Sequence, residues 1–346
     1  MIRFECDYLE GAPQPVLDAV VKASAQQHPG YGFDENSDHA KQLIRKACQL
    51  PASGGVHFLV GGTQANLTII AALLKPYQGV IAPDTSHISN HETGAIEATG
   101  HKILALSTDD GKLHASQVEA LCAAYEKETH KLFFVQPGMV YVSQTTEMGT
   151  MYTKQELADL YAVCRKYGLK VFVDGARLGY ALAAPDCDMT LADLPQLCDV
   201  FTLGGTKQGA LFGEAVVTTD AQLNRDLPYH IKQHGGLLAK GWLLGVQYEA
   251  LFTDNLYLRL AKHAADLAVR IHDSLAAMGF SFLYEHRTNQ QLPILTEDQF
   301  TKLNEQFSVD HFADLPDGRI AARICASWAT KEDDVTALLA YMKTLK

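Results

Sequence analysis

The sequence predicts an α/β fold, with a large domain built on a mostly parallel sheet of seven strands between helices and a small α+β domain after it. Between residues 55 and 220, short apolar runs alternate with amphipathic segments. Each run is apolar along its whole length, which is typical of strands buried on both faces of a parallel sheet. The chain of 346 residues is also longer than a single hydrophobic core usually supports, which favours two domains.

The large domain is expected to contain seven strands and three main helices. The expected strands are Val56–Val60, Val80–Ala82, Ile103–Leu106, Leu132–Val135, Val171–Val173, Val200–Leu203 and Ala215–Val217. The expected helices are Thr63–Leu74, Ser116–Lys127 and Lys154–Tyr167, and in the last of these the apolar residues recur at spacings of three and four. The short loop before Ala215 allows the final strand to run antiparallel to its neighbour.

The small domain is expected to follow a long helical pattern over Asn255–Met278. After Gly279 strands and helices alternate, and Thr330-Lys-Glu-Asp-Asp is typical of a capped, acidic helix start. We therefore expect a large domain over residues 1–255 and a small domain over 256–346. The first 25 or so residues are expected to pack on the small domain or on a partner subunit.

Composition excludes several classes of protein. The 29 lysine and arginine residues against 40 aspartate and glutamate residues give a formal net charge of −11, which argues against broad binding to nucleic acid or anionic membranes. The charged start of the chain does not resemble a signal peptide, and no stretch is apolar for the length of a membrane span. The seven cysteines are widely spaced without a Cys-x-x-Cys pair, which favours a reducing, cytoplasmic setting.

The expected ends of several strands carry residues with distinctive chemistry, and this is where α/β sheets bind ligands. Gly61-Gly62-Thr63-Gln64-Ala65-Asn66 joins a strand to a helix, so its backbone N–H groups and the helix N-terminus favour an anion. A plain Gly-Gly turn with a threonine cap is the alternative. The loop is not a nucleotide-binding P-loop, because no Gly-Lys-Ser/Thr follows at the required spacing.

Asp174 and Lys207 each follow a buried strand. A carboxylate in that position needs a cationic partner, such as a metal, an arginine or a protonated ring nitrogen; capping the next segment or pairing with Arg177 is the alternative. Desolvation of Lys207, which lies among glycines, lowers the pKa of its amine and makes it a nucleophile for an aldehyde. Their separation, 207 − 174 = 33 residues, is about one strand–helix–strand step, so we expect them in one pocket.

A third strand end carries His87, His91 and Glu92. Two histidines four residues apart next to a glutamate invite a metal interpretation, but the segment begins as a loop and no further ligand suggests itself. We therefore expect no metal. The flat imidazole of His87 is suited to stacking on a planar cofactor.

Together these groups fit pyridoxal 5'-phosphate (PLP) better than any other cofactor. PLP requires an amine for its aldehyde, a carboxylate for its pyridine nitrogen and N–H donors for its phosphate. Its substrates are amino acids, whose carboxylate is well bound by an arginine fork. Arg177 and Arg323 are the candidates for that fork, and a surface ion pair is the alternative for Arg323.

Over nearly its whole length the chain resembles the threonine aldolases of the β-eliminating lyase group, which are PLP enzymes of fold type I with an aspartate aminotransferase-like fold. The matching segments are Gly61-Gly62-Thr63-Gln64-Ala65-Asn66, His87 in Ser-His-Ile, Asp174-Gly175-Ala176-Arg177-Leu178, Thr206-Lys207 and Tyr31-Gly32-Phe33-Asp34. The Asp-Gly-Ala-Arg motif at this distance from the lysine is the most specific of them.

The resemblance implies a role for each matched residue. Residues 61–64 would form the phosphate loop, His87 would stack on the ring, and Asp174 would meet the pyridine nitrogen. Arg177 and Arg323 would hold the substrate carboxylate, and Lys207, preceded by Thr206, would be the Schiff-base lysine. Further residues are implied to contribute at the dimer interface or to the substrate: Tyr31, either Lys232 or Lys240 for a phosphate across the dimer, and Asp7.

Two segments depart from the family pattern. The family's Glu-Asn-x-His segment is read as Gln136-Pro-Gly-Met139, which places Met139 where a histidine is expected, and the N-terminal Ser-Asp-Thr becomes Cys6-Asp7-Tyr8. With Met139 in that place, the catalytic base would be His87, the freed amine of Lys207 or a bound water.

The expected function is cleavage of the Cα–Cβ bond of a β-hydroxy amino acid, threonine or allo-threonine, to glycine and acetaldehyde through a Lys207 aldimine. The alternatives are β-elimination, aminotransfer or racemisation of an amino acid on the same cofactor, or a catalytically idle protein with this fold. The expected partners are a small amino acid and further copies of the chain, as a homodimer or homotetramer with shared active sites.

Overall fold

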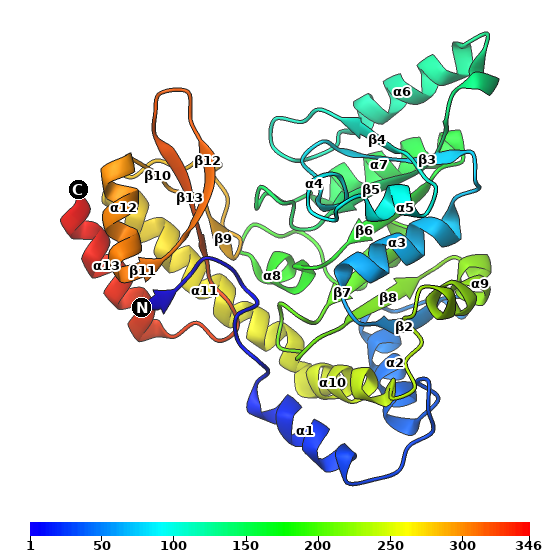
Figure 1. The fold of residues 1–346 in the computed structure, drawn as a ribbon, viewed down its shortest axis with the longest axis horizontal. Helices are drawn as coiled ribbons and strands as arrows, with labels where there is room; N and C mark the ends of the chain where they lie inside the picture. The colour runs from blue at the N-terminus through cyan, green and yellow to red at the C-terminus, as the bar shows by residue number, and fades with distance from the viewer.

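The centre of the structure is a seven-stranded sheet, described here from a computed structural model that covers residues 1–346 (Figure 1). In spatial order its strands are β2 (Gly55–Leu59), β8 (Glu214–Thr218), β7 (Val200–Gly204), β6 (Lys170–Asp174), β5 (Gln136–Ser143), β3 (Gln78–Pro83) and β4 (Ile103–Leu106). Strands β3 to β7 are parallel, whereas β8 runs antiparallel to both β7 and β2. The mostly parallel sheet and the antiparallel final strand confirm the predicted fold class.

Helices cover both faces of this sheet, so its strands are buried on both sides. One face packs against α2 (Glu35–Ala47), α6 (Ala115–Lys127), α7 (Lys154–Tyr167) and α10 (Trp242–Phe252). The other face packs against α3 (Gly62–Leu73), α9 (Ala221–Gln233) and the short helices α4 (His87–Asn90) and α5 (Ala95–Ala98). Alternate side chains of each strand enter the two layers, which explains why the strands are apolar throughout.

A second region follows the long helix α11 (Leu256–Ala277) and has its own hydrophobic core. Its sheet consists of β10 (Ile294–Leu295), β13 (Ile320–Cys325) and β12 (Asp310–Asp314), and β9 (Gln290–Gln291) also pairs with β13. Two helices pack on it, α12 (Glu297–Gln306) and α13 (Glu332–Met342). None of the helices in the structure has the length and apolar character needed to cross a membrane.

The N-terminal segment lies against both regions. Strand β1 (Ile2–Arg3) pairs with β11 (Phe307–Ser308) of the second region, and Phe4 is buried in that core. Helix α1 (Gln14–Ser24) then lies beside α10, below the large sheet in Figure 1. The short helix α8 (Leu178–Ala183) contacts α11 and so joins the two regions.

One predicted strand is wrong. Residues Lys131–Phe133 form a single 3-10 turn, in which Leu132 is 92% and Phe133 85% exposed, and the true strand β5 begins at Gln136. Proline is tolerated at the start of a strand, and a Cβ on Gly138 would lie 2.5 Å from Leu74 Cδ2, so glycine lets the strand pass close to the end of α3.

Candidate active site

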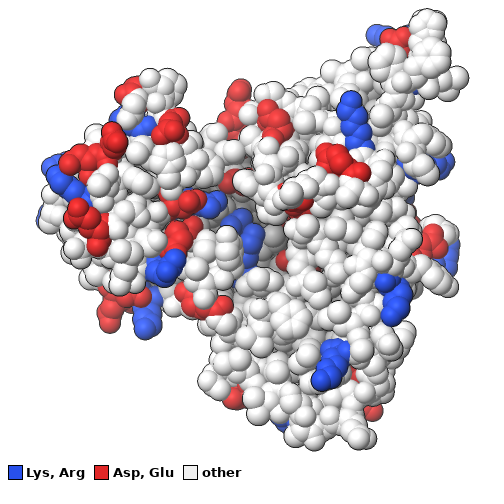
Figure 2. Space-filling model, in the orientation of Figure 1, with Lys and Arg blue, Asp and Glu red and all other residues white.

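A cavity of about 320 Å³ opens at the carboxyl ends of the parallel strands, a size typical of small-molecule sites. Eight of the predicted site residues line it: Gly61, Gly62, Thr63, His87, Asp174, Arg177, Thr206 and Lys207. Figure 2 shows basic side chains in the hollow between the two regions, with acidic side chains beside them. The structure therefore brings together segments that lie far apart in the sequence, in a pocket that carries both signs of charge.

Asp174 ends strand β6 and is 5% exposed. Its Oδ2 accepts hydrogen bonds from the Tyr141 hydroxyl (2.5 Å) and the Asn66 amide (3.0 Å), and its Oδ1 accepts one from the Ala176 N–H (2.9 Å). Three donors thus fix the carboxyl group at the cavity wall, where it is available to a cationic group of a ligand.

Lys207 lies in the loop after strand β7, at the same edge of the sheet as Asp174. Burial lowers the pKa of its amine, and the positive charge of Arg177 lowers it further, although nearby carboxylates oppose the shift. A lysine whose pKa is lowered by desolvation has a larger fraction of neutral amine, which is the form that attacks an aldehyde. The loop is held in place by the Gly213 N–H, which donates to Thr206 Oγ1 at 3.1 Å.

The N-terminus of α3 faces the same cavity through Gly61, Gly62 and Thr63. No side chain caps this helix, so its first N–H groups remain available to an anion. Gln64 does not line the cavity. Its Oε1 accepts from the Val60 N–H and its Nε2 donates to the His234 carbonyl, so it braces the loop from behind.

His87 is held by a buried acid. Its Nδ1 lies 2.8 Å from Glu92 Oε1, which also accepts from the Asn66 amide at 2.7 Å. Because a carboxylate accepts and does not donate, Nδ1 carries the hydrogen and Nε2 is left free. The hydrogen bond to Glu92 raises the pKa of His87 against the opposing effect of burial.

Arg177 pairs with Asp7 of the N-terminal segment. Its Nε and Nη2 donate to the two Asp7 oxygens at 2.7 and 3.0 Å, and Asn289 adds a third hydrogen bond at 2.9 Å. Asp7 is fully buried, yet the charges of Arg177 and Lys207 together with these hydrogen bonds outweigh burial and lower its pKa to about 2. A guanidinium has five N–H donors, so three remain for a further anion.

Arg323, Tyr31, Lys232 and Lys240 do not line the cavity of this chain. Arg323 lies on β13, where its Nη2 pairs with Asp310 at 2.6 Å and its buried Nε has no partner. Lys232 Nζ lies 4.8 Å from the centre of the Tyr31 ring, beside a separate cavity of about 220 Å³. Lys240 is exposed.

The placement of Met139 at the site is wrong. Met139 lies inside strand β5 and is fully buried in the core between the sheet and α3, whereas the strand reaches the cavity four residues later, at Ser143. Glu147 follows, and its Oε1 accepts from the Ser143 hydroxyl and the His87 N–H, each at 2.8 Å. The part of this segment that reaches the cavity is therefore Ser143–Glu147 and not Gln136–Met139.

Sequence reasoning missed other residues of the cavity: Asn66, Ser143, Thr145, Glu147, Phe212 and Glu214. Burial raises the pKa of Glu147, and it raises that of Glu214 to about 8. A signal for Glu214 exists, since it is an acid at the start of the apolar run Ala215–Val217. Asn66 belongs to the Gly61–Asn66 motif, which points to backbone donors, whereas its side-chain amide donates to Glu92 and Asp174.

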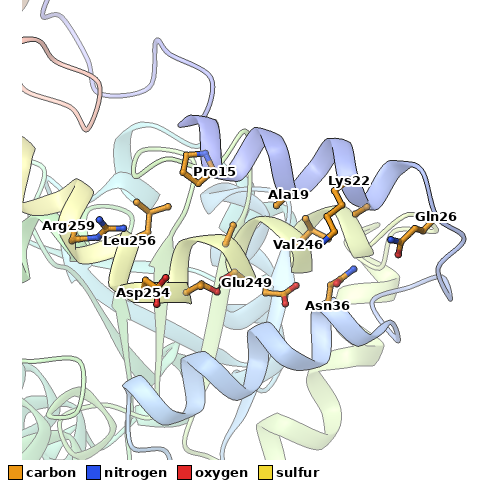
Figure 3. A pocket seen from close by; sticks show the side chains of 13 residues that line it. Pro15, Ala19, Lys22, Gln26, Asn36, Val246, Glu249, Asp254, Leu256 and Arg259 are labelled. Carbon is orange, nitrogen blue, oxygen red and sulfur yellow. Dashed lines mark hydrogen bonds between the residues drawn. The ribbon is translucent and has the colours of Figure 1, made fainter.

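A second cavity, of about 520 Å³, lies between α1, α2 and α10 (Figure 3). Of its charged side chains, Lys22, Asp254 and Arg259 are exposed to solvent and Glu249 is half-buried. It contains no desolvated lysine and no buried carboxylate, so its chemistry does not resemble that of the cavity around Lys207.

Comparison with known proteins shows which family the chain resembles. The family model of beta-eliminating lyases matches residues 12–298. The low specificity L-threonine aldolase of Pseudomonas aeruginosa is 30% identical over 97% of this chain and 95% of its own length, and that of a Pseudomonas species (strain NCIMB 10558) is 29% identical over 99% and 97%.

Solved structures agree. A structure of Leishmania major threonine aldolase covers 100% of this chain and 99% of its own, with 41% identity and a TM-score of 0.96. Thermus thermophilus aspartate aminotransferase shares the fold at 14% identity, with coverages of 100% and 92% and a TM-score of 0.70. This chain therefore belongs to the threonine aldolases of the beta-eliminating lyase family.

Proposed function

We propose that this protein is a PLP-dependent aldehyde-lyase that cleaves the Cα–Cβ bond of threonine or allo-threonine to give glycine and acetaldehyde. The observation that carries the proposal is the grouping of Lys207, Asp174 and the uncapped N-terminus of α3 around one cavity. The names of the bacterial relatives and of the Leishmania major structure support the choice of reaction.

The residues present fit PLP. The free N–H groups at Gly62 and Thr63 suit its phosphate, the fixed carboxyl of Asp174 suits a protonated ring nitrogen, and the amine of Lys207 suits the aldehyde. The imidazole of His87 lines the same cavity and is suited to covering the ring. When bound, PLP supplies an electron acceptor for the bond that breaks at the substrate's Cα.

The substrate carboxylate is assigned to arginine. Arg177 keeps three N–H donors after its pairing with Asp7, and the orientation of its guanidinium is fixed by that pairing. Arg323 is the second candidate, because its buried Nε lacks a partner. Burial lowers the pKa of His91, and the charges of His87 and Arg323 lower it further.

The proton of the β-hydroxyl group is assigned to His87. Glu92 orients the ring and leaves Nε2 free to accept, which is the arrangement of an oriented general base. The amine of Lys207 and a bound water remain the alternatives. They are distinguished by the pH dependence described in the Discussion.

The remaining expectations concern the whole protein. We propose a homodimer or homotetramer whose sites are shared, because Tyr31, Lys232 and Lys240 lie away from the cavity of their own chain and the neighbouring Phe33 and Tyr229 are 72% and 78% exposed. Sedimentation of the purified protein tests the oligomer. Two domains, 1–255 and 256–346, and a cytoplasmic location are also proposed, and limited proteolysis and cell fractionation test them.

The decisive experiment is product analysis with threonine and allo-threonine. Glycine with acetaldehyde supports the lyase, whereas ammonia with a keto acid supports β-elimination, and cofactor binding without any turnover supports an idle protein. The Lys207→Ala variant should lose both the absorption band of the lysine-bound cofactor and the activity. If the variant keeps both, the assignment of Lys207 is wrong.

A further inference from the structure

Glu214 lies between the two loops that define the cavity. It is the first residue of β8, and the sheet pairs it with Leu59 at the end of β2 and with Gly204 at the end of β7. The chain enters the Gly61–Thr63 loop directly after Leu59 and the Lys207 loop directly after Gly204. The antiparallel course of β8 thus delivers this side chain to the carboxyl edge of the parallel strands.

The Glu214 side chain is aimed into the cavity but has no partner there. The residue is 4% exposed and lines the cavity, and its Oε2 is buried without a hydrogen bond. Its Oε1 lies near the start of α3, 3.9 Å from where a Cβ on Gly62 would stand. A buried carboxylate without donors is strongly disfavoured, whereas a neutral carboxylic acid carries a hydrogen that it can donate.

The groups around Glu214 favour the neutral form. Burial raises its pKa to about 8 and the negative charge of Asp174 on β6 adds to this, while the charge of Lys207 opposes it. The phenols of Tyr248 on α10 and Tyr257 on α11 also sense its charge, and burial raises the pKa of both, so they remain neutral. The α3 side contributes backbone N–H groups and no ionisable side chain.

We propose that Glu214 acts as a neutral carboxylic acid that donates a hydrogen bond toward the phosphate group bound at the start of α3, and that its ionisation sets the upper pH limit for holding that group. The inference rests on the proposed cofactor, because PLP is the phosphate-bearing ligand that the cavity fits. An ionised Glu214 would place a further negative charge beside the phosphate dianion, and it would also have no hydrogen to donate.

The test measures binding of pyridoxine 5'-phosphate to the full-length protein freed of cofactor. This compound has the ring and the phosphate but no aldehyde, so it cannot react with Lys207. Affinity is measured by titration calorimetry between pH 7 and pH 9 for the unaltered protein, Glu214→Gln and Glu214→Ala. Glu147→Gln is the matched control, since Glu147 is a buried acid of the same cavity that already has two donors.

We expect the ratio of the Glu214→Gln affinity to the affinity of the unaltered protein to depend on pH. Glutamine keeps a donor and does not ionise, so the affinity of Glu214→Gln relative to the unaltered protein should be near one at pH 7 and rise roughly tenfold by pH 9, as one linked ionisation near pH 8 requires. Glu214→Ala should bind about fivefold more weakly at pH 7, the effect of one lost hydrogen bond, and Glu147→Gln should leave the pH dependence unchanged.

Two results would overturn the inference. One is an affinity ratio between Glu214→Gln and the unaltered protein that does not change from pH 7 to pH 9. The other is a Glu214→Gln protein that binds pyridoxine 5'-phosphate as weakly as Glu214→Ala at pH 7. Failure of the proposed function looks different, because then neither PLP nor pyridoxine 5'-phosphate binds to any of the proteins at any pH. Binding of pyridoxine, which lacks the phosphate, should be insensitive to Glu214→Gln throughout.

Discussion

The pair between Asp7 and Arg177 should dominate the stability of the N-terminal segment. Asp7→Asn keeps the size of the side chain and its contact with Asn289 but removes the charge that faces the buried guanidinium. The pKa of Asp7 is lowered from 3.8 to about 2, and this difference corresponds to roughly 2.4 kcal/mol of stability at neutral pH. Breaking a buried ion pair typically costs about 3–5 kcal/mol, so we expect a loss of about 2–5 kcal/mol.

The assay is urea unfolding followed by circular dichroism at several pH values. Because the pKa of Asp7 is lowered in the folded protein, its contribution is present above pH 3.8 and is lost as the pH falls toward 2. The difference between Asp7→Asn and the unaltered protein should therefore be full at pH 7 and shrink below pH 4. Asp298→Asn is the control, since it removes the same charge from an exposed pair with Lys302. If the two variants are equally stable at pH 7, the reasoning about the buried pair is wrong.

Three further predictions concern the site. Glu92→Gln should weaken the hydrogen bond that raises the pKa of His87, so the acidic limb of the kcat/KM profile should move to lower pH; an unmoved limb would argue against His87 as the base. Met139→Leu should leave products and KM unchanged, whereas Met139→His should lower stability in urea because it buries a polar ring in the core; a more active histidine variant of normal stability would contradict the placement of Met139. Arg323→Ala should raise the KM for threonine about tenfold with kcat nearly constant, while the exposed Arg319→Ala should change neither, and an unchanged KM in the first variant would remove Arg323 from the site.

The predictable part of the site consists of residues that follow buried strands. Asp174 directly follows an apolar run and Lys207 follows another after a short glycine-rich turn, and parallel strands place such ends together. Glu214 was not found, because it begins a strand and reaches the same edge only through the antiparallel pairing of β8. The pairing of Asp7 with Arg177 could not be predicted either, because the two residues are 170 positions apart and no local pattern encodes their contact.

The fold class was predicted from apolar runs in the sequence, and the same criterion placed one strand wrongly. Apolar runs locate strands as long as the runs are buried, and most of them are. Leu132 and Phe133 form an apolar run that the structure leaves exposed, while β5 begins with Gln136 and Pro137, which do not resemble a strand. Burial is a property of the whole fold, so the pattern alone could not separate these two segments.

The pairing of β1 with β11 also affects how the protein folds during synthesis. Ile2 and Arg3 leave the ribosome about 300 residues before their partners Phe307 and Ser308. At translation rates of about 5–20 residues per second, this delay lasts roughly 15–60 s. During that time Asp7 also lacks Asn289, so the large sheet must form while its N-terminal segment is still unpaired. The hydrogen-bonded group of Arg177, Asp7 and Asn289 is therefore expected to form late, after the second region has folded.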